Sequence, residues 1–183
     1  MKEDLLLIEE YKRGSINAFE TLYKKYASKM KGVAFRYLND SFIAEDIVQE
    51  AFVKVFKKIK DFQPTGHFEA WLRRVVVNTA INYYLSLKKE NEKKAEFSLS
   101  PENESTDNFE EDDLYSLEEL TTAVNMLPSG YKMVFNLYAI DEYTHKEIAE
   151  KLQITEGTSK SQLFKARAFL KSVLQNKKII QND

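Results

Sequence analysis

The sequence predicts an all-α protein that consists of two small helical domains. Its 183 residues include only five glycines and three prolines, and apolar residues recur three and four positions apart almost throughout, a period typical of amphipathic helices. Residues 96–113 break this pattern with eight acidic and no basic residues, which is the profile of a solvated linker. The hydrophobic content of 43%, with 13% aromatic residues, is sufficient for a core on each side of that linker.

The segment before the linker is expected to contain three or four helices. Asn17 followed by Glu20 resembles a capping box, which predicts a helix over 18–31 that either stops there or continues through 31–38. Asn39-Asp40-Ser41 has the residues of a turn and a helix cap. The later helices of this half are expected at residues 42–58 and 68–88. The inner faces should be formed by Phe19, Leu22, Tyr23, Tyr26, Met30, Ile47, Val48, Ala51, Phe52, Val55 and Phe56.

Beyond the linker the apolar period resumes and predicts four further helices. They are expected to cover residues 114–126, 131–139, 144–152 and 156–170. Leu127-Pro128-Ser129-Gly130 separates the first two, and the chain is expected to fray from Gln175 onward. The predicted organisation is therefore a domain over 1–92, an acidic linker over 93–113 and a domain over 114–178.

Composition excludes several classes of site. The chain has no cysteine and only two histidines, His67 and His145, so disulfides and thiolate metal sites are excluded and no metal site or other cofactor is expected. It has no apolar run of about 18 residues, and its acidic N-terminus is unlike a signal peptide. Neither a small-molecule substrate nor membrane insertion is expected, and the predicted compartment is the cytoplasm.

The net charge of −2 argues against a nucleic-acid binder, but its distribution argues for one. Residues 1–95 carry 18 basic and 13 acidic side chains, residues 96–119 carry none and 10, and residues 120–183 carry 9 and 6. The net charges of these three segments are +5, −10 and +3, so two basic blocks flank one acidic segment. Such an asymmetry is more informative about partners than the total charge.

The last two predicted helices have the pattern of a helix-turn-helix. Their crossing requires apolar side chains, which are supplied by Ile148, Ala149, Leu152, Ile154, Leu163 and Ala166. The outer face of the second helix carries Lys160, Ser161, Phe164 and Lys165, which offer phosphate neutralisation, hydrogen bonds and an apolar contact for a thymine methyl group. The alternative is an amphipathic surface helix whose lysines are only solvated.

The C-terminal half also resembles the DNA-binding domain of bacterial sigma factors that recognises the minus-thirty-five promoter element. The resemblance is carried by Leu127-Pro128, Val134-Phe135-Asn136-Leu137, Glu147-Ile148-Ala149-Glu150-Lys151-Leu152, Gly157-Thr158, Lys160-Ser161 and Lys165-Ala166-Arg167. It implies base and backbone contacts for Lys160, Ser161, Phe164 and Lys165, with phosphate support from Thr144, Thr158 and Arg167.

Three residues depart from that pattern. Gln153 replaces the usual turn glycine, so its backbone is expected near positive φ, at a cost of about 1 kcal/mol. Ser159 replaces a buried valine and should reduce the apolar contact between the two helices, and Gln162 replaces an arginine. His145 is expected to be a surface residue at a helix start.

In the N-terminal half, Asp46, Gln49 and Glu50 share one helix face opposite the apolar stripe. Acid–base chemistry or metal binding is disfavoured because no histidine lies nearby, and an ordinary solvated face is one alternative. The segment 43–52, however, resembles the polymerase-binding helix of sigma domain two. That resemblance implies docking of the acidic face on the clamp helices of the β′ subunit.

Residues 68–84 resemble the sigma helix that recognises the minus-ten element. Capture of unstacked bases requires aromatic groups and a shaped loop, here the loop 62–67. The residues assigned to this element are Phe62, Gly66, His67, Phe68, Arg73, Arg74, Asn78 and Asn82. The alternative for one of the two arginines is that its side chain extends across the domain surface. Trp71 is expected to belong to the core, and Asn82 and Leu85 depart from the family's aspartate and arginine.

Together these segments identify the chain as resembling a sigma factor of the extracytoplasmic-function class. The resemblance implies a specificity subunit and not an enzyme, with RNA polymerase core (β′ clamp helices and β flap), promoter DNA and an anti-sigma factor as partners. It also implies association with the nucleoid when active, and a linker that occupies the nucleic-acid channel of polymerase or serves only as a tether. The alternatives are a helix-turn-helix regulator that acts without polymerase and a helical adaptor that binds only proteins.

Overall fold

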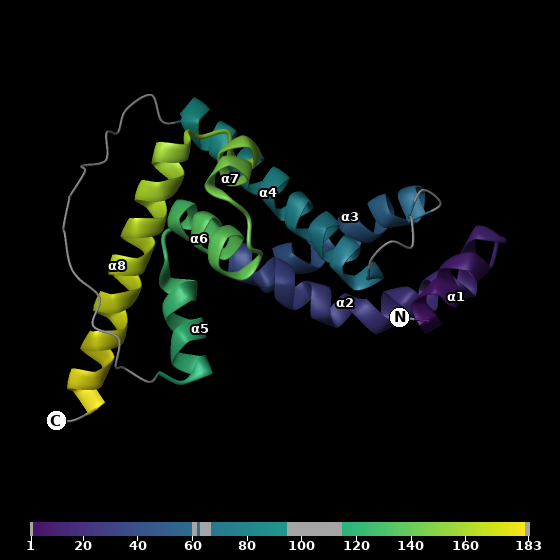
Figure 1. Cartoon of the computed structure of the whole chain (residues 1–183), viewed down its shortest axis with the longest axis horizontal. Helices are drawn as coiled ribbons and strands as arrows, with labels where there is room; N and C mark the ends of the chain where they lie inside the picture. The colour runs from purple at the N-terminus through teal and green to yellow at the C-terminus, as the bar shows by residue number, and fades with distance from the viewer. Residues whose placement is uncertain (1, 60–61, 63–66, 95–114, 182–183) are drawn as a thin grey trace. The chain divides into compact units, whose positions relative to one another are not determined.

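The computed structural model describes residues 2–59, 62, 67–94 and 115–181, and every regular element in these ranges is helical (Figure 1). The chain divides into two compact units, Met1–Ser86 and Leu87–Asp183. The all-α prediction is confirmed for the described residues. Most of the predicted linker lies outside them, so the domain boundaries stay a prediction.

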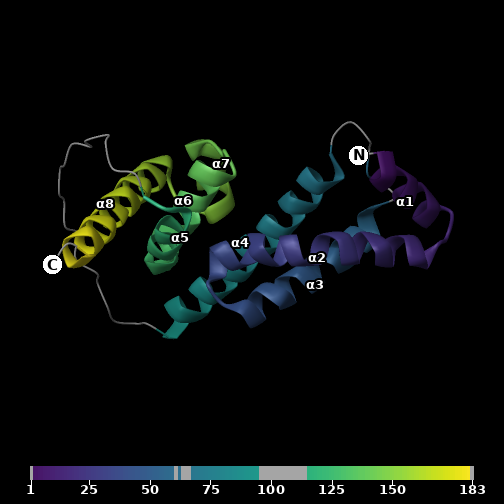
Figure 2. The same cartoon turned by 90° about the horizontal axis from the view of Figure 1, so that it is seen from below.

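The first unit is built around the long helix that spans Ile16–Leu38. Its elements are α1 (Lys2–Lys12), α2 (Ile16–Leu38), α3 (Ser41–Lys58) and the part of α4 (Phe68–Lys94) that precedes residue 87. The helix α1 packs on α2, and α2 packs on α3 along much of its length (Figure 2). Its core is formed by fully buried apolar side chains: Ile8, Leu22, Met30, Val55, Ile59, Leu72, Val76 and Val77.

The helix boundaries in this unit follow from local capping. The Ser15 hydroxyl accepts a hydrogen bond from the backbone of Ala18, so the predicted capping box at Asn17 is wrong and α2 starts one residue after Ser15. The two segments predicted over 18–38 form one continuous helix, which ends where Asn39 adopts a left-handed conformation, φ 54°. The predicted cap of α3 is confirmed: Asp40 accepts hydrogen bonds from two backbone N–H groups, at 2.8 and 3.0 Å.

Helix α1 was not predicted from the sequence. Four consecutive apolar residues, Leu5 to Ile8, hide the helical period in this segment. In the structure, Asp4, Ile8 and Tyr11 lie on the buried face of α1, and the Tyr11 hydroxyl donates a hydrogen bond to the carbonyl of Phe56 at 3.3 Å. The buried residues of α1 are therefore spaced four and three positions apart, as in an amphipathic helix, but one of them, Asp4, is charged.

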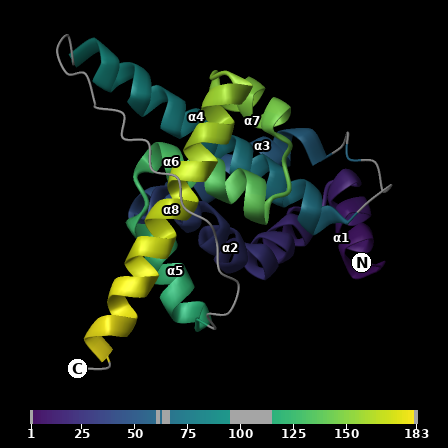
Figure 3. The same cartoon turned by 60° about the vertical axis from the view of Figure 1, so that its left-hand side comes forward.

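The second unit is organised around α8 (Figure 3). Its elements are α5 (Leu117–Met126), α6 (Ser129–Phe135), the π-helical turn η2 (Asn136–Ile140), α7 (His145–Leu152) and α8 (Glu156–Gln181). The helices α5, α6 and α7 all contact α8. Two predictions are corrected here: the helix expected over 131–139 ends in π-helical geometry, and α8 stays helical from Gln175 to Gln181 where fraying was expected.

Candidate nucleic-acid and partner-binding surfaces

The helices α7 and α8 form the predicted helix-turn-helix. Gln153 ends α7 in the left-handed conformation, φ 56° and ψ 44°, as expected from its place in the turn. The Thr155 hydroxyl then caps the start of α8 by accepting a hydrogen bond from the Thr158 backbone at 3.0 Å. Five of the six predicted crossing residues are buried: Ile148, Ala149, Leu152, Leu163 and Ala166. This crossing fixes which face of α8 is directed toward solvent.

The solvent-directed face of α8 carries the residues predicted to contact base edges. Lys160, Ser161 and Phe164 are all exposed. Ser161 and Phe164 follow Lys160 by one and four positions, which places the three residues on one side of the helix. Phe164 is 44% exposed, and the polar residues Ser161 and Arg167 lie three positions before and after it on the helix. Lys165 lies half-buried at the edge of this face, and Arg167 is exposed on the flank. The face therefore combines cationic, hydroxyl and apolar groups on a rigid helix.

The two threonines predicted to support a phosphate lie near helix N-termini. Thr144 is the N-cap of α7 and forms a capping box with Glu147, whose carboxylate accepts a hydrogen bond from the Thr144 backbone at 2.8 Å. Thr158 is in the first turn of α8, where its hydroxyl lies 2.9 Å from that of Thr155. The partial positive charge at a helix N-terminus attracts anions. Both positions are thus compatible with the predicted role, although the hydroxyls already have partners within the protein.

A polar contact between α7 and α8 was missed by the sequence analysis. Ser159 is fully buried, and its hydroxyl lies 2.9 Å from Nδ1 of His145, which was expected to be a surface residue but is half-buried. The imidazole also stacks on Tyr138, with ring centroids 4.6 Å apart. Ser159, which replaces the valine of the resembled family, therefore has a hydrogen-bonding partner in His145, 14 residues earlier.

The environment of His145 favours its neutral form. Burial lowers the pKa of the imidazole, the positive charges of Lys160 and Arg167 lower it further, and the negative charge of Glu156 opposes them. Arg167 also lies over the Tyr138 ring, 5.9 Å from its centroid. The titration of His145 is thus coupled to cations of the predicted DNA-binding face.

A second polar face runs along α4. Arg74, Asn78 and Asn82 are exposed and follow one another at intervals of four residues, so they share one side of the helix. His67 is exposed just before α4 begins. Arg73 is half-buried and does not share this line, so the two arginines predicted as phosphate contacts have different environments.

Aromatic residues at the start of α4 form a packed cluster. The ring centroids of Phe62, Phe68 and Trp71 lie 5.3 to 5.8 Å apart. Phe62 and Phe68 are buried, so their rings support the surface and are not presented to solvent, in contrast to their predicted DNA contacts. Trp71, predicted to be core, is half-buried at the edge of the cluster. Gly66 lies outside the described residues.

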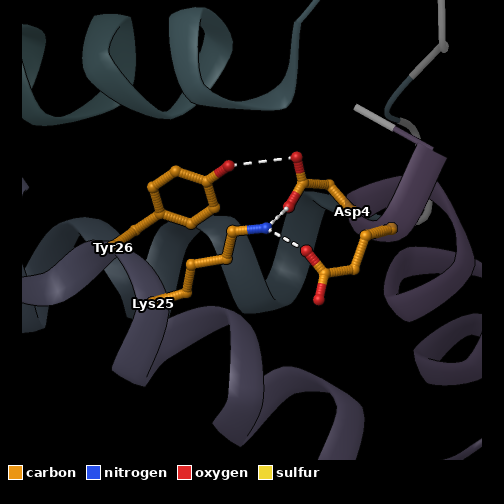
Figure 4. Close-up of polar contacts among 4 residues, drawn as sticks. Asp4, Lys25 and Tyr26 are labelled. Atoms are coloured by element: carbon orange, nitrogen blue, oxygen red, sulfur yellow. Dashed lines mark hydrogen bonds and ion pairs between the residues drawn. The ribbon is translucent and has the colours of Figure 1, made fainter.

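A polar cluster connects α1 with this aromatic group (Figure 4). The buried Asp4 carboxylate accepts hydrogen bonds from Lys25 at 2.8 Å and from the Tyr26 hydroxyl at 3.0 Å, and Lys25 also pairs with Glu3 at 2.7 Å. Burial and the hydrogen bond to Asp4 raise the pKa of Tyr26 to about 12. The Tyr26 ring meets Phe68 edge-on at 5.6 Å. Helix α1 is thereby linked through α2 to the start of α4.

The acidic residues of α3 lie on its exposed face. Asp46, Gln49 and Glu50 are all exposed, opposite the buried stripe of the same helix. Glu50 forms an ion pair with Lys54 at 2.7 Å, whereas Asp46 forms none with any lysine or arginine that the structure describes. The face is available for a partner with positive charge.

Metal and membrane sites receive no support from the described ranges. Among the residues described, no three His, Asp or Glu side chains are grouped closely enough to hold a metal ion. None of the described helices combines the length and hydropathy that a membrane crossing demands.

Comparison with protein families gives two matches in chain order. Residues 22–90 match the family described as Sigma-70 region 2, and residues 117–170 match Sigma-70, region 4. The chain is 30% identical to the ECF RNA polymerase sigma-E factor of Escherichia coli, with 94% of each chain covered. It is 28% identical to the RNA polymerase sigma-H factor of Pseudomonas aeruginosa, with 95% of each covered.

Solved structures share the fold at lower sequence identity. The sigma factor RpoE from Bartonella quintana, in complex with the anti-sigma factor NepR, has a TM-score of 0.50 and 20% identity over 87% of this chain and 98% of its own. CnrH, in complex with the cytosolic domain of CnrY, has a TM-score of 0.50 and 21% identity over 95% and 98%. At these identities the similarity concerns the fold alone.

Proposed function

The chain belongs to the extracytoplasmic-function (ECF) class of the sigma-70 family, and from this premise we propose that three exposed helix faces divide the work of promoter recognition among them. As a sigma factor it binds RNA polymerase core and promoter DNA and directs transcription initiation. In our proposal, the acidic face of α3 binds polymerase, α4 captures the minus-ten strand and α8 recognises the minus-thirty-five duplex. The polymerase supplies the chemistry, and this chain supplies specificity.

The observation that carries the proposal is the exposed face of α8. Lys160 and Ser161 project beside Phe164 from a helix whose opposite side is locked into the crossing with α7. A helix of this width enters the major groove, where lysine neutralises phosphate or contacts guanine, serine hydrogen-bonds to base edges and an apolar group meets the thymine methyl. An exposed phenylalanine between polar groups is explained by such a contact better than by solvation.

The face of α4 suits a single strand better than a duplex. Asn78 and Asn82 offer both donors and acceptors to the Watson–Crick edges that are free only after strand separation. Arg74 on the same face neutralises the strand, and the half-buried Trp71 offers a ring edge beside it. We assign Phe62 and Phe68 a supporting role because they are buried. We retain His67 and Gly66 as parts of the predicted loop.

The acidic face of α3 is assigned to the clamp helices of the polymerase β′ subunit, and the second unit to the β flap. Asp46, without an ion pair among the described residues, supports this assignment because a basic partner would complete its interactions. An anti-sigma factor would act by covering these same faces. We place the active protein in the cytoplasm, associated with the nucleoid through polymerase, with domains over 1–92 and 114–178.

The test is reconstitution with purified polymerase core. The full chain is incubated with core and a pool of genomic DNA fragments, and the 5′ ends of the transcripts are mapped. We expect co-purification with core and a set of start sites that share two upstream elements. A chain that binds duplex DNA but neither co-purifies with core nor directs initiation would instead support the helix-turn-helix regulator that acts without polymerase.

A further inference from the structure

The acidic face of α3 also carries two apolar side chains that are more than half exposed. Phe42 is 84% exposed and Val53 is 53% exposed. Relative to Phe42, the polar residues Asp46, Gln49 and Glu50 follow at four, seven and eight positions and Val53 at eleven, which places all five on one side of the helix. The two apolar groups thus lie about 16 Å apart along the helix axis, on either side of the polar centre.

The orientation of this face is set by the rest of the helix. The opposite stripe of α3 is buried throughout: Ala44, Ile47, Val48, Ala51, Phe52 and Val55. At the first turn, the Asp40 carboxylate accepts a hydrogen bond from the backbone N–H of Phe42 at 2.8 Å. The helix cannot rotate to bury Phe42 without exposing its core stripe. The backbone of Phe42 is thus already in the position from which its side chain can contact a partner.

We propose that Phe42 and Val53 are apolar anchors of the polymerase-binding surface, flanking the acidic centre formed by Asp46, Gln49 and Glu50. This inference rests on the proposed function of α3 and extends it from a charged patch to an apolar–acidic–apolar surface. Its occupant is a helical surface of polymerase core that presents basic side chains between apolar ones. In such a pattern the apolar anchors contribute binding energy, and the charges between them select the partner.

The charges on the face argue against the other occupants. Promoter DNA would meet the carboxylates of Asp46 and Glu50, which repel phosphate. A second copy of the chain, related by two-fold symmetry, would bring the same carboxylates toward one another. Of these three candidates, polymerase is the partner for which both the apolar and the acidic groups are favourable.

The experiment measures the affinity of the full chain for polymerase core by fluorescence anisotropy. We expect Phe42→Ala to weaken binding about tenfold or more and Val53→Ala to weaken it less, because large buried aromatic groups dominate interfaces. Phe42→Leu should retain most of the affinity. The matched control is Ile16→Ala, an apolar residue that is 72% exposed on α2 and should leave binding unchanged.

Salt dependence separates the two kinds of contact. The loss caused by Phe42→Ala should persist at high ionic strength, whereas the loss caused by Asp46→Ala should shrink as the charges are screened. Unchanged thermal unfolding of each variant confirms that the fold is intact.

The outcomes distinguish this inference from the function on which it rests. If Asp46→Ala weakens core binding but Phe42→Ala and Val53→Ala do not, the apolar anchors are rejected and the polymerase-binding face stands. If none of these changes affects core binding, the assignment of α3 itself is rejected. An equal loss for Ile16→Ala also overturns the proposal, because the effect would then not be specific to this face.

Discussion

The hydrogen bond between His145 and Ser159 joins the first turn of α7 to the first turn of α8. A buried serine in a helix crossing needs a partner for its hydroxyl, and Nδ1 of His145 provides one at 2.9 Å. Burial and the positive charges of Lys160 and Arg167 lower the pKa of His145, with Glu156 acting in the opposite direction. The folded second unit therefore favours a neutral imidazole.

We expect this pair to make the stability of the second unit depend on pH. In the unfolded chain His145 has a pKa of about 6.5, so on acidification the unfolded state takes up a proton before the folded state does. The stabilisation is present above that pKa and is lost as the pH falls through it toward the lower folded value. In His145→Gln this component should disappear, so the melting temperature should change less between pH 7.5 and pH 5.5 than in the wild type, as followed by calorimetry.

The chain provides its own control for this prediction. His67 is its only other histidine, is exposed and lies in the other unit. His67→Gln should keep the wild-type pH dependence. A His145→Gln protein with an unchanged pH dependence would show that the imidazole does not titrate differently on folding.

Single residues differ in how far the sequence determines them. The left-handed conformation of Gln153 was predictable because the residue occupies the position at which the resembled family has a turn glycine. The contact of His145 with Ser159 was not, because it joins residues 14 positions apart and exists only through the crossing of two helices. The burial of Phe62 and Phe68 was not predictable for a similar reason. An aromatic residue is equally suited to a base-binding surface and to a core, and only its spatial neighbours distinguish the two.

At the scale of elements, capping and apolar period predicted most helices. Asp40 marked the start of α3 correctly, while at α2 two polar residues competed and Ser15, not Asn17, is the cap. Helix α1 was not predicted because four consecutive apolar residues, Leu5 to Ile8, hide its period and because its buried face includes the charged residue Asp4. The π-helical turn η2 likewise carries no local signature in the sequence.

The attachment of α1 to α2 depends on the carboxylate of Asp4. Burial raises the pKa of Asp4, but the hydrogen bonds from Lys25 and Tyr26 together outweigh it, and the pKa lies below its ordinary value. Its contribution to stability is therefore present above the unfolded pKa of about 3.9 and is lost as the pH falls through the lower folded value. At neutral pH the carboxylate is charged and fully engaged.

We expect Asp4→Asn to destabilise the first unit by about 1 to 3 kcal/mol, because an amide replaces an ionised acceptor of two hydrogen bonds. The measurement is the free energy of unfolding from urea denaturation at pH 7. Glu3→Gln is the matched control: Glu3 pairs with the same Lys25 but its side chain is 73% exposed, and exposed pairs contribute little. Equal effects of the two changes would contradict a special role for the buried carboxylate.

At the scale of the whole molecule, the charge distribution is more informative than the net charge. The basic blocks over 1–95 and 120–183 coincide with the parts that match sigma regions 2 and 4. The order of the helices and the identity of both regions were predictable because the motifs span long, strongly patterned segments. The exposed side of each helix was less predictable, as Arg73 and Arg74 illustrate, since adjacent residues on α4 differ in burial.

The proposed division of labour predicts that binding of polymerase and recognition of the upstream element are lost separately. Asp46→Ala combined with Glu50→Ala should weaken core binding, whereas Lys160→Ala combined with Lys165→Ala should leave core affinity unchanged. The lysine variant, assembled into holoenzyme at saturating concentration, should bind an upstream-element duplex several-fold more weakly and with a smaller salt dependence, because it releases fewer counterions. Holoenzyme made with the acidic-face variant, also at saturation, should bind that duplex like the wild type. If either pair of substitutions reduces both activities equally, polymerase and promoter share one surface and the division among α3, α4 and α8 is wrong.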